Sequence, residues 1–178
     1  AVQVSGLNSP RDTSLCTHVY IGDNDVEYTR QSPFGIKMSE DVVISQNRVS
    51  HSHIRQTGNW CGGVTYQYGP IRLWIVCNVF DDLDHAIKGA SPADVGSVYV
   101  VGNIAKGIEA DTTNAPGGET PDDDGGAPGA AFHMNGCNEQ HWVNNTIYGS
   151  WQGWVTELND NTVSIDVANN IVSTTTQR

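Results

Sequence analysis

Titratable side chains recur at matching positions of several short segments in this sequence. Lys88 and His133 occupy the same place in two segments, whereas Asp84 and Glu109 each follow an asparagine by six residues, with Asp81 close by. An amine or an imidazole can accept a proton, and grouped carboxylates can hold a divalent cation. If the fold brings these residues together, they form a candidate proton-transfer site, with Lys88 or His133 as the base and the carboxylates as metal ligands.

Aromatic and basic residues indicate a second kind of candidate site, one that binds glycans. Trp60, Trp151 and Trp154 are candidate platforms for sugar rings, and Lys37 and Arg72 are candidate contacts to anionic groups. Tryptophan in a repeat protein is as often packed beneath a loop, so both interpretations stay open.

Ordinary structural roles account for many of the same residues. Outward positions on a solvated sheet must be polar, and stacked opposite charges such as Asp81 and Lys106 form cross-strand pairs worth less than about 1 kcal/mol. The acidic run from Asp122 to Asp124 does not fit the EF-hand spacing, which favours a solvated acidic loop over a calcium site. No Ser/His/Asp triad, Cys/His pair or phosphate-binding glycine loop stands out in the sequence.

A repeated cassette must position these residues. It runs from Ile165 to Val172 as alternating apolar and polar residues interrupted by an asparagine, and it recurs around five earlier asparagines, 23 to 42 residues apart: Asn24, Asn47, Asn78, Asn103 and Asn145. Alternation on both sides of the asparagine predicts a short strand, a tight corner and a second short strand. Asparagine suits the corner because it tolerates the left-handed region and its amide can bond the asparagine of the next coil.

A third strand precedes most cassettes, so we expect three short strands in each coil. Alternation places one set of its side chains inward, namely Ile36, Met38, Val64, Tyr66, Ile87, Phe132 and Met134. The other set, Lys37, Thr65, Lys88 and His133, is expected to point outward. The sequence therefore predicts an all-β fold, a parallel β-helix of about six coils, as one domain over residues 1–178 with a surface loop inserted at 111–129.

The cassettes VISQNRVSH, LWIVCNVF, VYVVGNIAKGI, WVNNTIYGS and IDVANNIVS resemble the right-handed parallel β-helix proteins of the pectate-lyase-like superfamily, from Val19 to Val172. For the lyases of that superfamily, the resemblance implies a groove on one sheet face, a Ca²⁺ ion held by carboxylates and a lysine or arginine base. On this chain it suggests a polysaccharide lyase for an anionic polysaccharide, with Lys88 or His133 as base and Ca²⁺ among Asp81, Asp84 and Glu109. The Glu-x-Glu ligand pair expected of some such lyases is absent after Asn78, and Asp81-Asp82 lacks the Gly-His and Arg-x-Lys elements of the polygalacturonase type.

Composition narrows the classes of function. The net charge of −11 argues against nucleic acid as a partner, and no apolar run approaches the about 20 residues that span a bilayer. The chain begins with Ala1, from which we expect a processed, secreted, extracellular protein. Four cysteines without CxxC spacing (Cys16, Cys61, Cys77 and Cys137) favour disulfides, with buried free thiols as the alternative. Asn144 begins an N-glycosylation sequon.

The terminal coils suggest the leading hypothesis for function. A solenoid exposes an apolar cross-section at each end, and the sequence shows no amphipathic helix to cap either end. We therefore expect a structural protein that stacks end to end into an extracellular filament, or that forms a stalk segment. The residues expected to carry this self-association are Val2, Val4, Val19 and Ile21 at one end and Ile165, Val167, Ile171 and Val172 at the other. The alternatives are the polysaccharide lyase and a glycan-binding adhesin.

Overall fold

The computed structural model describes most of the repeat. The described residues are 2–5, 16–29, 32–52, 62–68, 72–90, 95–108, 130–135, 137–150, 152–157 and 162–173. Trp60, Cys61, Glu109, Trp151 and the loop expected at 111–129 therefore lie outside the described residues.

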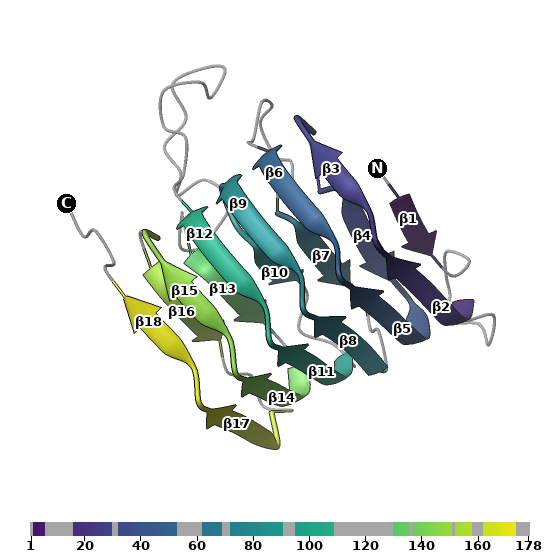
Figure 1. Cartoon of the computed structure of the whole chain (residues 1–178). Coiled ribbons are helices and arrows are strands. Elements are labelled where there is room, and N and C mark those ends of the chain that lie inside the picture. Colours follow the sequence, from purple (N-terminus) through teal and green to yellow (C-terminus); the bar gives the residue numbers. More distant parts are fainter. Residues whose placement is uncertain are drawn as a thin grey trace, which may run out of the picture.

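Three parallel sheets of six strands make up the described part of the chain (Figure 1). Sheet A contains β1 (Val2–Ser5), β4 (Phe34–Lys37), β7 (Val64–Gln67), β10 (Ile87–Ala90), β13 (Ala130–Asn135) and β16 (Gln152–Glu157). Sheet B contains β2 (Cys16–Gly22), β5 (Ser39–Ser45), β8 (Arg72–Val76), β11 (Val95–Val101), β14 (Cys137–Val143) and β17 (Ser164–Ala168). Sheet C contains β3 (Asp25–Glu27), β6 (Arg48–Ser52), β9 (Val79–Leu83), β12 (Ile104–Ile108), β15 (Thr146–Tyr148) and β18 (Ile171–Ser173). Each strand pairs with the strand three positions later in the chain, which confirms a parallel β-helix of about six coils with three strands in each.

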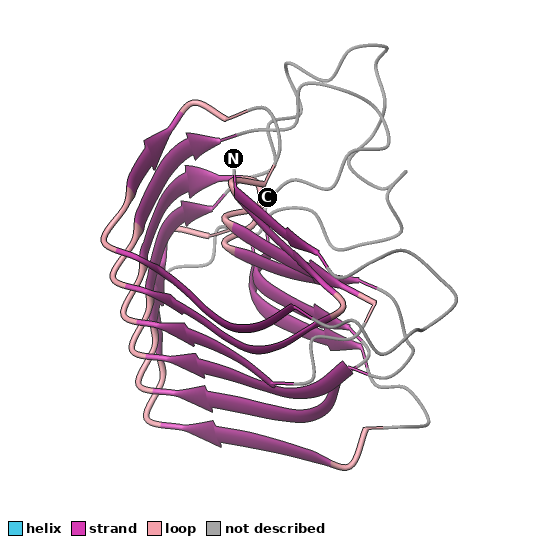
Figure 2. Ribbon diagram, turned by 90° about the vertical axis from the view of Figure 1, so that its right-hand side faces the viewer, coloured by secondary structure: helices cyan, strands magenta, loops and turns pink. Residues whose placement is uncertain are grey.

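The corners of successive coils lie directly above one another (Figure 2). Equivalent side chains therefore form inward rows that run along the helix axis. One row contains Ile44, Ile75, Val100 and Trp142, each exposed by 1 % or less. Each fully buried apolar side chain contributes about 1.5–3 kcal/mol, so these rows are the main source of stability.

Tyr66 shows how the core fits a large ring between coils. Its hydroxyl lies 3.3 Å from Sδ of Met134 and 3.0 Å from Sγ of Cys137, which belong to a coil beyond that of Gly89. A Cβ atom at Gly89 would lie 2.2 Å from the Tyr66 hydroxyl oxygen, so only glycine leaves room for the ring.

The asparagines form a ladder at the corner between sheets B and C. In each rung the backbone N–H and the side-chain Nδ2 of one asparagine both donate to Oδ1 of the asparagine in the next coil. These distances are 2.8–3.1 Å over the whole series Asn24, Asn47, Asn78, Asn103, Asn145 and Asn170. The predicted amide contacts between coils are therefore confirmed.

The left-handed residue of this corner is not the asparagine. The residue before each asparagine adopts φ between 53° and 66°, and these residues are Asp23, Gln46, Cys77, Gly102, Asn144 and Asn169. The expected left-handed asparagine is thus wrong, because the ladder needs the asparagine backbone N–H and side chain on the same side. Met38 is also wrong as a core residue, since it is only partly buried and lies at a corner with φ 45°.

The three described cysteines are free thiols, so the expected disulfides are not formed among them. Cys77 is exposed, Cys16 is partly buried, and Cys137 is buried beside Tyr66. Burial raises the pKa of the Cys137 thiol to about 12, so this thiol stays protonated. Within the described part of the chain, no helix is long and apolar enough to span a bilayer.

Candidate functional site

A cluster of buried polar residues lies on the outer side of sheet A. Lys88 is in register with Thr65 on one side and with His133 on the other, and Asp84 and His85 precede their strand. Their exposed fractions are 1 % for Lys88, 3 % for Asp84, His85 and His133, and 8 % for Thr65. We call these five residues the sheet A cluster. The expectation that Lys88 and His133 face solvent is wrong, although they do point away from the apolar core.

Contacts from neighbouring segments account for this burial in part. A Cβ atom at Gly62 would lie 3.5 Å from Cβ of His85 and 3.6 Å from Cβ of Lys88, so the chain at Gly62 lies over the cluster. The rings of His85 and His133 are 6.0 Å apart, and Nδ1 of His85 lies 3.0 Å from the carbonyl oxygen of Ala130. Because a carbonyl only accepts, Nδ1 carries the proton and Nε2 is the acceptor atom of this imidazole.

The environment strongly disfavours a charge on His85. Burial, followed by the positive charge of Lys88, lowers its pKa to about 3 against the opposing effects of the Ala130 carbonyl and the Asp84 carboxylate. His133 adds a smaller lowering effect. The cluster therefore combines a neutral imidazole, a second imidazole, an amine and a carboxylate away from water, which is a set of groups able to exchange protons.

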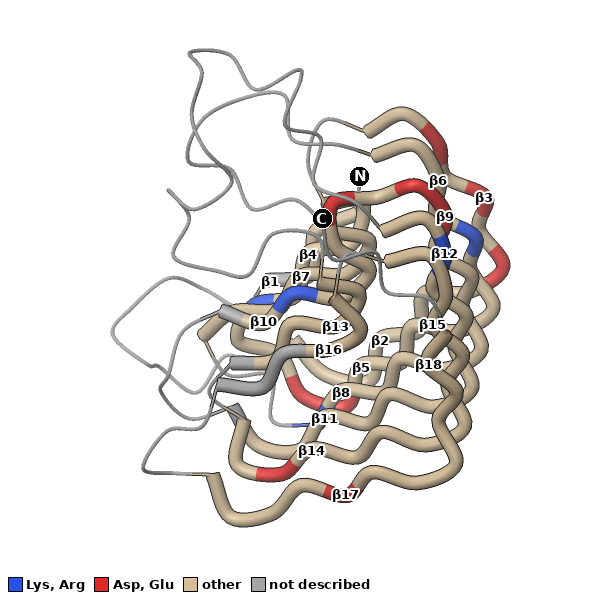
Figure 3. The backbone as a smooth tube through the Cα atoms, turned by 90° about the vertical axis from the view of Figure 1, so that its left-hand side faces the viewer, with Lys and Arg blue, Asp and Glu red and all other residues tan. Residues whose placement is uncertain are grey.

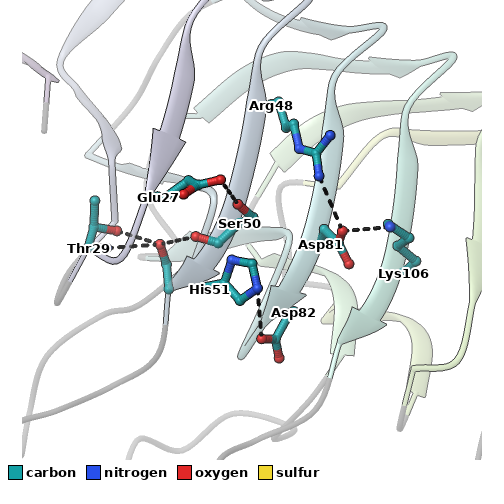
Figure 4. Close-up of polar contacts among 9 residues, drawn as sticks. Glu27, Thr29, Arg48, Ser50, His51, Asp81, Asp82 and Lys106 are labelled. Carbon is teal, nitrogen blue, oxygen red and sulfur yellow. Dashed lines mark hydrogen bonds and ion pairs between the residues drawn. The ribbon is translucent and has the colours of Figure 1, made fainter.

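The two described residues among those expected to hold a metal ion, Asp81 and Asp84, are not brought together. Asp84 lies in the sheet A cluster, whereas Asp81 lies on the outer face of sheet C, where its carboxylate pairs with Lys106 and lies 3.8 Å from Arg48 (Figure 4). Glu109 lies outside the described residues. In the described ranges, no three His, Cys, Asp or Glu side chains lie close enough together to hold a metal ion.

Sheet C instead carries a network of ion pairs along its outer face. Asp82 lies 3.8 Å from His51 on the next strand, and Figure 3 shows acidic and basic segments next to one another at β6, β9 and β12. These side chains are partly exposed, so solvent screens each pair and its contribution to stability is small. Ion pairing between neighbouring strands therefore explains why charged residues recur at this position of the repeat, and no catalytic or metal site is needed to explain them.

The three described residues among those expected to bind glycans also lie apart. Trp60 and Trp151 lie outside the described residues, and Trp154 is 38 % exposed on β16 with its ring edge-on to Trp142. The amine of Lys37 lies over the Tyr68 ring beside sheet A, whereas Arg72 on sheet B pairs with Glu40 and Asp41.

Sheet B carries an aromatic ladder that sequence reasoning missed. Trp74, Tyr99 and His141 stack with nearly parallel rings, at centroid distances of 5.5 Å and 4.5 Å. Each residue lies four positions before its asparagine, and this shared offset was the available signal. The facing sides of the rings cover one another, so the ladder stabilises the stacking of three successive coils and leaves less ring surface for a sugar.

The last coil exposes its inward-facing side chains. Trp154, Ile165, Val167 and Val172 continue the core rows of sheets A, B and C, yet they are 36–49 % exposed. The first coil is more closed, because Val2 is 46 % exposed but Val4 and Ile21 are 7 % and 6 % exposed. The C-terminal face of the helix is therefore an apolar surface with three edge strands.

No protein-family model, no curated protein and no solved structure gives a significant match to this chain.

Proposed function

We propose that this chain is a structural β-solenoid that associates with a second copy of itself through its C-terminal coil. A secreted protein of this kind would build an extracellular filament or a stalk segment. The observation that carries the proposal is the exposure of four side chains of the last coil, Trp154, Ile165, Val167 and Val172. They point toward the core, but among the described residues no further coil covers them.

The energetics of this face favour a partner. Each of the four side chains is already more than half buried, so covering it adds roughly 1 kcal/mol, about half of the full burial of such a residue. Strands β16, β17 and β18 are also the last strands of their sheets, and an edge strand presents backbone groups that another strand can pair with. An end-on contact satisfies both requirements at once.

Sedimentation velocity over a range of concentrations tests the proposal. Wild-type protein is expected to form larger species as concentration rises, and Val167→Glu is expected to weaken this association by more than about tenfold because it places a charge in the contact. Ile104→Glu is the matched control, since Ile104 is 40 % exposed on the side of the helix and not at its end. A wild-type protein that stays monomeric, with both variants behaving identically, would rule out this function.

The sheet A cluster supports a second candidate function, an acid–base enzyme acting on an anionic polysaccharide. Burying Asp84, His85, Lys88 and His133 together is energetically unfavourable unless the groups are paired, and such sets often mark catalytic sites. The resemblance to the pectate-lyase-like superfamily points to the same chemistry, with Lys88 or His133 as the base.

Incubation with alginate, pectate and glycosaminoglycans tests this candidate through the absorbance of the unsaturated product. Activity that is lost in His133→Asn, with an unchanged circular dichroism spectrum, would support it. Activity that persists unchanged in that variant would exclude His133 as the base. If no polysaccharide gives a product, the enzymatic function is excluded for these substrates and the structural role is the remaining proposal.

A further inference from the structure

The asparagine ladder has a direction. In every rung, the N–H groups belong to the coil nearer the N-terminus and the accepting Oδ1 belongs to the coil nearer the C-terminus. The two ends of the ladder are therefore chemically different.

The end residues show this difference directly. Within the described part of the chain, Oδ1 of Asn24 accepts no hydrogen bond and the backbone N–H of Asn170 donates none, whereas Nδ2 of Asn170 donates to the carbonyl of Trp142. The C-terminal face thus presents donors at this corner, and the N-terminal face presents an acceptor.

A rung does not depend on the length of chain between its two coils. Asn24 and Asn47 are 23 residues apart, and Asn103 and Asn145 are 42 residues apart, yet their Nδ2–Oδ1 distances are 2.8 Å and 3.1 Å. Stacking of two coils is what forms the rung. A rung between two separate chains therefore needs only the same stacking.

The core rows match across such a contact. Following each row past the last coil and restarting it at the first coil places apolar residues on apolar residues: Trp154 on Val2, Ile165 on Val19, Val167 on Ile21, and Val172 on Val26. The backbone pattern continues as well, since the N–H of each corner residue donates to the coil above, as Asn144 does to Ala168 at 3.0 Å. By repetition, the N–H of Asn169 would donate to the carbonyl of Gly22.

We infer that the partner of the C-terminal coil is the N-terminal coil of a second copy, in register, with Asn170 of one chain donating to Oδ1 of Asn24 in the next. This inference rests on the proposed end-on association and adds its direction. Two C-terminal faces meeting each other would set the Asn170 donors against donors, which leaves these groups without acceptors. On the N-terminal face Val2 is 46 % exposed, whereas Val4 and Ile21 are almost fully buried in the single chain, so Val2 is the open part of that face. A head-to-tail contact repeats without closing and gives an open filament.

Two blocked variants, mixed in equal amounts, test the direction. Val167→Glu blocks the C-terminal face and Val2→Glu blocks the N-terminal face, and both valines are 46–49 % exposed, so the monomer fold should tolerate either change. Head-to-tail contact predicts that each variant alone is monomeric and that the mixture forms a one-to-one dimer that grows no further. Association of Val2→Glu with itself, with no dimer between the two variants in the mixture, would show tail-to-tail contact and overturn the inference while keeping the proposed function. Monomeric wild-type protein would overturn both.

Asn170→Asp tests the hydrogen bond of the ladder itself and leaves the apolar residues of both faces unchanged. Aspartate keeps an oxygen for the bonds from Asn145 but removes Nδ2, which loses both the bond to the Trp142 carbonyl and the outward donor, and it places a carboxylate opposite Oδ1 of Asn24. We expect association to weaken by about tenfold or more, the size of one lost hydrogen bond with added repulsion. Asn169→Asp is the matched control, with the same charge change at the neighbouring exposed residue. Equal effects of the two substitutions would overturn the ladder contact.

Discussion

At the scale of single residues, the most informative positions are polar groups held away from water. His85 is kept neutral by burial and by Lys88, and its one clear hydrogen bond goes to the Ala130 carbonyl. Gln140 occupies a core row between Val98 and Ile165 and is 0 % exposed, with neither side-chain atom hydrogen-bonded to the described residues. Both residues therefore reduce the stability that the same positions would have with apolar or paired side chains.

His85 makes stability depend on pH. Its pKa is about 3 in the folded chain and 6.5 unfolded, so the unfolded state binds more protons between these values and stability falls as pH falls. The contribution is complete above about pH 6.5, and roughly 2 kcal/mol should be lost between pH 7 and pH 5. His85→Asn, which retains a donor for Ala130 but does not titrate, should flatten the dependence in urea unfolding over this range. His18→Asn is the control, because His18 is an exposed histidine; an unchanged slope in His85→Asn would contradict the assignment.

Gln140 predicts a stabilising substitution. Gln140→Leu removes two buried polar atoms without hydrogen bonds and completes an apolar row, so the free energy of unfolding should rise by about 1–3 kcal/mol. Thermal or urea unfolding measures the change. Glu139→Leu, on the outward side of the same strand, is the control for added hydrophobicity, and it also removes the acceptor of the Ser97 hydroxyl. A loss of stability in Gln140→Leu would contradict the argument, because it would show that the amide stabilises the chain.

At the scale of elements, the corner between sheets B and C combines a left-handed residue with the ladder asparagine that follows it. Five of the six left-handed positions carry a side chain, and only Gly102 is a glycine. A side chain in this region is strained relative to glycine by about 1 kcal/mol. The asparagine itself is more restricted in residue type, because its side-chain amide and its backbone N–H both donate to the asparagine of the next coil.

This division predicts opposite effects at equivalent corners. Gln46→Gly should stabilise the chain slightly, since φ is 60° there, whereas Gly102→Ala should destabilise it by about 1 kcal/mol because φ is 66°. A Cβ atom at Gly102 would also lie 3.3 Å from Sγ of Cys77, which adds to the loss. Thermal unfolding of both variants, with Ser45→Gly as a strand control, measures the pair. Changes of the same sign at Gln46 and Gly102 would contradict the argument.

At the scale of the whole molecule, the two ends differ more than the middle coils do. The apolar rows are covered at every interior coil and open at the last one. In the proposed end-on contact, a second copy would complete the core of the first, so stability and association would be linked.

This link predicts a concentration-dependent melting temperature. Binding of the native state to another copy stabilises it by mass action, so Tm should rise as wild-type concentration rises. Val167→Glu should remove the dependence and Ile104→Glu should retain it. Calorimetry over a hundredfold range of concentration checks this, and a constant wild-type Tm would count against association of the native chain.

The winding could be predicted from local pattern alone. Strand alternation and the six asparagines specify which residues form each coil, and parallel stacking then requires the asparagines to align. The outward position of Lys88 and His133 relative to the core followed from the same alternation. Their burial did not, because alternation says which side of a strand a residue occupies but not whether another segment covers that side. The stacked rings of Trp74, Tyr99 and His141 also became visible only in three dimensions, since contacts between coils join residues 23 to 42 positions apart. Asp81 and Asp84 separate for another reason, because strand β9 ends at Leu83, between the two.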